Sequence, residues 1–114
     1  MKIYIAGPMR GIKDFNFPAF DAAANHLTKL NFEVVNPAEL DRQAGFDGMG
    51  TKGDDSEVGQ DTLREMVRRD FIALTTCDGI YLLKGWQHSR GARAEYAIAE
   101  LLGMVVWHEE HDLK

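Results

Sequence analysis

The stretch GIYLLKGWQHSRGARAEYAIAELLGMVVW, residues 79–107, decides the fold. It begins and ends with short apolar runs, at 79–83 and 104–107, which are typical of buried strands. Between these runs the sequence predicts a helix that Ser89 caps and that ends near Gly103. Two short strands separated by a helix favour a parallel sheet.

The rest of the chain continues this alternation of strand and helix. Apolar runs at 2–6 and 32–35 predict two more strands, and apolar residues at helical spacing predict helices at 17–30 and 61–75. The sequence therefore predicts an α/β domain whose parallel sheet has helices on both faces. Residues 41–60 hold several glycines and acidic residues, and we expect a mobile surface loop of the kind that forms lids.

Length and composition limit the kind of protein. The 114 residues suit one domain spanning 1–114. The net charge of −5 argues against a nucleic-acid polymer as partner. A small anionic ligand is compatible with this net charge, because local positive fields and backbone N–H groups act on a ligand more strongly than the average charge of the chain. Cys77 is the only cysteine, and neither a signal-peptide pattern nor a run of about 20 apolar residues is found, so we expect a cytoplasmic protein with no membrane partner.

Glu95 stands on the apolar face of the predicted helix after Ser89. Ala92, Ala99 and Leu102 lie three, four and seven positions away, which places all four side chains on one face. The carboxylate is also one turn from the helix start, where negative charge is favourable. Glu95 is therefore either a satisfied structural carboxylate or a functional group turned toward the core.

Asp70 occupies a similar position on the helix predicted at 61–75. Its apolar neighbours on that face are Leu63, Val67 and Leu74. An unpaired buried carboxylate is costly, so Asp70 is either paired or functional, and we expect Arg68 and Arg69 to point elsewhere on the helix. Two inward carboxylates on the helices that flank the strand at 79–83 indicate paired acid and nucleophile chemistry.

Two loops have the composition of an anion site. GPMRG at 7–11 and WQHSRGAR at 86–93 follow predicted strands, and ligands of parallel sheets bind beyond the carboxyl ends of the strands. Arg10, Ser89 and Arg93 are suitable phosphate partners beside a helix N-terminus. A tight turn followed by an ordinary N-cap explains the same pattern. We expect no metal site, because the histidines at 108 and 111 are typical of a solvated end.

These residues together form a recognisable pattern. It reads Tyr-x-x-Gly-x-x-Arg-Gly, then Asp, then Ser-x-Gly-x-x-x-Glu, carried by Tyr4, Gly7, Arg10, Gly11, Asp70, Ser89, Gly91 and Glu95. The pattern resembles the nucleoside 2-deoxyribosyltransferase superfamily, and within it the 2′-deoxynucleoside 5′-monophosphate N-hydrolases. Uncharacterised phage and prophage proteins are similar to this chain in the same segments.

The resemblance implies a Rossmann-like, flavodoxin-type sheet of four to five strands and a role for each site residue. Glu95 would be the nucleophile at the anomeric carbon, Asp70 would assist protonation of the leaving base, and Tyr4 would orient the nucleophile. The 5′-phosphate would be held by Gly7, Arg10, Gly11, Ser89 and Gly91, to which the composition of the loops adds Arg93. The family forms homodimers or larger homo-oligomers, whose neighbouring subunit often completes the site, and it needs no cofactor.

The expected function is cleavage of the N-glycosidic bond of a 2′-deoxynucleoside or its 5′-monophosphate through a glutamate nucleophile. Hydrolysis would make the protein an N-glycosidase, and base exchange would make it a deoxyribosyltransferase. Two alternatives stay open. One is a non-catalytic module that binds or senses NAD, ADP-ribose or a nucleotide, and the other is an interaction protein that keeps the fold without using the site.

Overall fold

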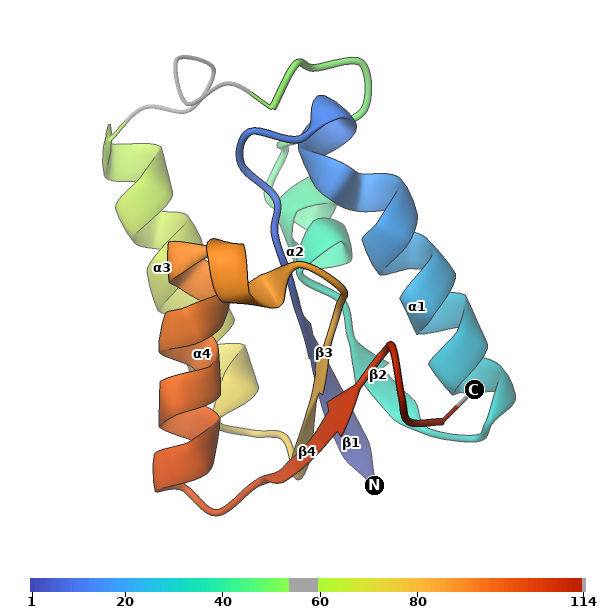
Figure 1. Cartoon of the computed structure of the whole chain (residues 1–114). Coiled ribbons are helices and arrows are strands. Elements are labelled where there is room, and N and C mark those ends of the chain that lie inside the picture. Colours follow the sequence, from blue (N-terminus) through green and yellow to red (C-terminus); the bar gives the residue numbers. More distant parts are fainter. Residues whose placement is uncertain (54–59, 114) are drawn as a thin grey trace.

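The chain folds into a four-stranded parallel sheet with helices packed against it (Figure 1). The computed structural model describes residues 1–53 and 60–113. The elements in chain order are β1 (Lys2–Ala6), η1 (Lys13–Asn16), α1 (Phe17–Lys29), β2 (Glu33–Val35), α2 (Pro37–Gln43), α3 (Gln60–Leu74), β3 (Gly79–Leu82), η3 (Trp86–His88), α4 (Arg90–Leu101) and β4 (Val105–His108). The strand order β2-β1-β3-β4 is that of flavodoxin-like sheets, so the predicted α/β, Rossmann-like fold class is confirmed.

Two apolar cores lie on opposite faces of the sheet, because side chains of a strand alternate between faces. Ile3 and Ile5 of β1 pack in one core with α1 and α2, whereas Tyr4 and Ala6 pack in the other with α3 and α4. Figure 1 shows the two helix pairs on either side of the sheet. Tyr4, fully buried in a central strand, therefore points toward α3 and α4.

Helix α2 corrects the prediction of a loop over 41–60. It begins after Asn36, whose side chain accepts a hydrogen bond from the backbone N–H of Ala38 at 3.0 Å, and it continues through residues 41–43. Gln60 already belongs to α3. Much of the expected mobile loop falls on residues 54–59, outside the described residues.

The loop after β1 is joined to the segment after α2. The backbone N–H of Gly11 donates to the carbonyl of Gly53 at 2.7 Å, and that of Asp14 donates to the carbonyl of Thr51 at 3.0 Å. Gly11 has a φ of 79°, a conformation that favours glycine. The loop that carries Arg10 is thus held in place by a segment about 40 residues away in sequence.

Within residues 1–53 and 60–113, no helix combines the length and the apolar character that crossing a membrane requires.

Candidate active site

Three side chains from three elements meet on the face that α3 and α4 cover. Tyr4 comes from β1, Asp70 from α3 and Glu95 from α4. The Tyr4 hydroxyl donates a hydrogen bond to Oε2 of Glu95, across 91 positions of sequence. Asp70 lies near enough for its charge to raise the pKa of both Glu95 and Tyr4. The structure therefore brings together the two carboxylates and the tyrosine that the sequence singled out.

Local sequence explains why Glu95 faces the sheet. The Ser89 hydroxyl accepts a hydrogen bond from the backbone N–H of Ala92 at 3.1 Å, which fixes the start of α4. Ala92 and Ala99, on either side of Glu95, are almost fully buried and small enough to bring the helix close to the sheet. Leu102, expected on the same face, is instead 53% exposed, because α4 ends at Leu101.

Burial dominates the electrostatics of Glu95. Its side chain is buried, and desolvation, together with the charge of Asp70, raises the pKa of Glu95 from 4.5 to about 8, although the hydrogen bond from Tyr4 lowers it. Burial thus outweighs the favourable position of Glu95 one turn from the helix start. The carboxylate accepts its hydrogen bond from the Tyr4 hydroxyl. Burial and the nearby carboxylates raise the pKa of this hydroxyl well above 10.0. Tyr4 thus keeps its proton and acts as a fixed donor.

Asp70 holds an unpartnered carboxyl oxygen. Its Oδ1 is buried and has no hydrogen-bond partner among the described residues. Desolvation, with a smaller contribution from the charge of Asp41, raises the pKa of Asp70 from 3.8 to about 7, against the lowering effect of Arg69. A carboxyl group with this proton affinity is able to donate a proton near neutral pH.

The surroundings of Asp70 differ from the sequence prediction in two respects. Arg69 does not point away, because its Nε lies 3.8 Å from Oδ1 of Asp70. Val67, expected to share the buried stripe, is 43% exposed, while Leu74 is fully buried as predicted. Asp70 therefore sits where the buried face of α3 gives way to a more open one.

Asp41 is a site residue that the sequence analysis missed. It lies on α2, is only 4% exposed, and its Oδ1 accepts a hydrogen bond from the NH2 nitrogen of Arg69. Desolvation raises the pKa of Asp41 from 3.8 to about 6 even though Arg69 lowers it. The signal that could have found it was Asn36-Pro37, an N-cap followed by proline at the first helical position.

The two predicted anion-binding loops lie next to each other at the carboxyl ends of β1 and β3. A side chain on Gly7 would place its Cβ 2.7 Å from Cβ of Leu83, and one on Gly85 would place its Cβ 3.5 Å from Pro8. Gly7 is thus required for packing between the loops. Gly11 donates its N–H to Gly53 rather than leaving it for a ligand.

The remaining predicted ligand residues are at the surface. Arg10 follows β1, and Gly91 and Arg93 lie in the first turn of α4; all three are exposed. Gly91 has open space where a Cβ would stand, with Ser89 Oγ the nearest atom at 4.0 Å. Ser89 uses its oxygen to cap α4. These side chains border the same edge of the sheet without forming a closed site.

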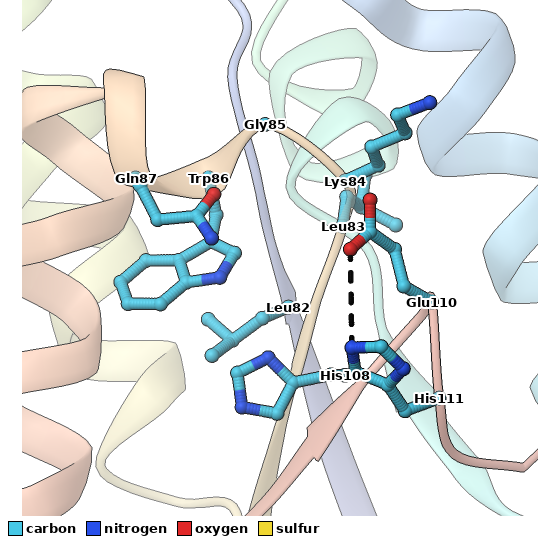
Figure 2. A pocket seen from close by; sticks show the side chains of 9 residues that line it. All are labelled: Leu82, Leu83, Lys84, Gly85, Trp86, Gln87, His108, Glu110 and His111. Atoms are coloured by element: carbon cyan, nitrogen blue, oxygen red, sulfur yellow. Dashed lines mark ion pairs between the residues drawn. The ribbon is translucent and has the colours of Figure 1, made fainter.

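A pocket of about 180 Å³ lies at the ends of β3 and β4 (Figure 2). Trp86, His108 and His111 line it, with the His111 ring 4.0 Å from the Glu110 carboxylate. His111, whose side chain is 74% exposed, belongs to a solvated end as predicted, and both histidines also line this pocket. Among the described residues, no cluster of three or more histidine, cysteine or acidic side chains is arranged to hold a metal ion. Tyr4, Asp70 and Glu95 do not line this pocket.

Comparison with known proteins identifies a family without an activity. A family model described as a domain of unknown function, DUF4406, matches residues 1–53 and 55–108. No curated protein matches the chain.

Proposed function

The chain belongs to the DUF4406 family, and we propose that it cleaves the N-glycosidic bond of a 2′-deoxynucleoside or its 5′-monophosphate. The observation that carries this proposal is the buried hydrogen bond from Tyr4 to Glu95 with the unpartnered carboxyl of Asp70 nearby. The resemblance of the motifs to nucleoside 2-deoxyribosyltransferases supports the choice of substrate.

In the proposed reaction Glu95 is the nucleophile and Asp70 is the general acid. The Glu95 carboxylate attacks the anomeric carbon, and the bond from that carbon to the base nitrogen breaks with its electron pair going to the base. Asp70 gives its proton to the departing base. Water then attacks the same carbon, returns a proton to Asp70 and frees Glu95 as a carboxylate. If a second base attacks instead of water, the outcome is base exchange.

This chemistry requires Glu95 without a proton and Asp70 with one. Because the two carboxyls interact, they titrate as a pair, and between about pH 7 and 8 they share one proton. The productive state, with the proton on Asp70 and Glu95 ionised, is one of the two singly protonated states of this pair. Positive charge developing on the sugar favours the ionised form of Glu95.

The surface loops offer a place for a 5′-phosphate. Arg10 and Arg93 supply cationic side chains on a chain whose net charge is −5. The start of α4 adds backbone N–H groups that favour an anion. In this proposal the phosphate is held at the rim by Arg10 and Arg93, while the sugar reaches inward to Glu95.

One observation favours a second candidate function, a module that binds a nucleotide without turnover. The pKa of Glu95 is about 8, because of burial, so its carboxyl is mostly protonated at neutral pH. A protonated glutamate donates a hydrogen bond to a ligand but makes a poor nucleophile. Such a module would hold NAD, ADP-ribose or a nucleotide.

A panel of deoxynucleosides and their 5′-monophosphates separates the two functions. Chromatography measures free base, and thermal unfolding measures binding. The enzyme proposal predicts base release from at least one compound by the wild type and by the control Glu65→Gln, an exposed glutamate on α3. Stabilisation by nucleotides with no base released from any of them would favour the binding module instead.

A further inference from the structure

We propose that Asp41 is a positioning residue for Asp70, because it holds the Arg69 guanidinium and so keeps Arg69 from hydrogen bonding to the Asp70 carboxyl. This inference rests on the proposed function, in which Asp70 protonates the leaving base. It adds a third carboxylate, from a helix on the other face of the sheet, to the two that the motifs identify.

The contacts of Arg69 are divided between two carboxylates. Its NH2 nitrogen donates to Asp41 Oδ1, while its Nε stands 3.8 Å from Asp70 Oδ1. That separation is too long for a hydrogen bond. Both Arg69 Nε and Asp70 Oδ1 are buried and have no hydrogen-bond partner among the described residues. A donor and an acceptor of opposite charge thus form an ion pair at 3.8 Å but no hydrogen bond.

Such an arrangement needs something that holds the guanidinium back. A buried donor and acceptor left unpaired are both costly, and a guanidinium readily binds a carboxylate with two parallel hydrogen bonds. Arg69 has Asp70 as its chain neighbour and still makes its short contact with Asp41. Since the side chain of Asp41 is only 5% exposed, little water competes for that contact. Asp41 therefore takes Arg69 as its own partner and leaves Oδ1 of Asp70 without a hydrogen bond.

Two charged groups act on the pKa of Asp70, in addition to its burial. Asp41 on α2 raises its pKa, and Arg69 on α3 lowers it. In the other direction, the charge of Asp70 raises the pKa of Glu95 on α4 and of Tyr4 on β1. Loss of the Asp41 charge would remove a raising influence and also free Arg69 to pair with Asp70. Both effects lower the pKa of Asp70.

The test is the pH dependence of Asp70 in Asp41→Asn. The general acid must hold its proton, so a lower pKa moves the limb of the kcat profile that Asp70 controls to lower pH, and we expect a shift of at least about one unit. Arg69→Gln should move the same limb to higher pH, and the double variant Asp41→Asn/Arg69→Gln should bring it back toward the wild type. Asp47→Asn, an exposed aspartate after α2, serves as the matched control and should leave the limb in place.

A second readout keeps the test independent of turnover. Carboxyl carbon shifts in protein labelled at aspartate, with Asp70→Asn to assign the signal, report the pKa of Asp70 directly. A lower pKa in Asp41→Asn supports the inference even if no substrate is ever turned over. An unchanged or raised pKa overturns it, including when base release is intact. The double variant removes both buried charges together, and its comparison with Arg69→Gln measures the direct effect of the Asp41 charge on the pKa of Asp70 without Arg69.

Discussion

Replacement of Tyr4 by phenylalanine removes the hydroxyl that donates to Glu95 and leaves the buried ring in place. A hydrogen bond to a charged group contributes about 1.5–3 kcal/mol, which corresponds to about 1–2 pKa units. The variant should therefore raise the pKa of Glu95 from about 8 by that amount. At any pH below this pKa, the ionised form of Glu95 that the reaction needs becomes roughly tenfold rarer for each unit.

The assay is kcat/KM for base release from about pH 5.5 to 10, with thermal unfolding to confirm the fold. We expect a loss of about 10- to 100-fold at the optimum and an optimum displaced to higher pH by about half of the pKa change. Tyr96→Phe is the matched control, because Tyr96 directly follows Glu95 in the sequence but its hydroxyl donates a hydrogen bond to Glu100. A Tyr4→Phe profile that falls in height while its optimum stays in place would refute the reasoning.

Three further predictions follow from the same contacts. Because the pKa of Glu95 is raised in the folded state, the contribution of Glu95 to stability is complete below about pH 4.5 and is lost as the pH rises toward 8. The melting temperature of Glu95→Gln should therefore exceed that of the wild type at pH 8 and equal it near pH 4.5, a pH dependence that Glu65→Gln should not show. Arg10→Ala should raise KM about tenfold or more for 5′-monophosphates and leave KM for free deoxynucleosides unchanged. An equal rise for both classes of substrate would show that Arg10 does not bind the phosphate. Gly7→Ala should lower the free energy of unfolding by about 1–3 kcal/mol in denaturant titrations, because the new Cβ would stand 2.7 Å from Leu83; wild-type stability would show that the loop shifts freely.

Strand and helix periods were enough to predict most of the fold. Each of the four strands was predicted within two residues of its observed limits, and Ser89 caps α4 as expected. The periodicity was strong there because these elements bury a continuous face. Helix α2 was not predicted, because it is only seven residues long. Its buried side chains, among them Ala38 and Asp41, are too few to show a helical period.

The sequence predicted the candidate site only where the direction of the Cα–Cβ bond decides where a side chain points. Helical spacing correctly turned Glu95 and Asp70 inward, since their direction is set by the backbone. The same reasoning failed for Arg69, because a long flexible side chain reaches a partner that its Cβ direction does not reveal. That partner, Asp41, lies 28 positions away on the helix that was not predicted. Leu102 was misplaced because the helix ends before the stripe does.

The rate of base release by Glu95→Gln, relative to the wild type on the best substrate of the panel, tests the central claim most directly. The substitution keeps the shape of the side chain and removes the carboxylate that would attack the sugar. We predict a loss of at least about a thousandfold, with Glu65→Gln unaffected. Release of base by Glu95→Gln at a rate within about tenfold of the wild type would contradict the account.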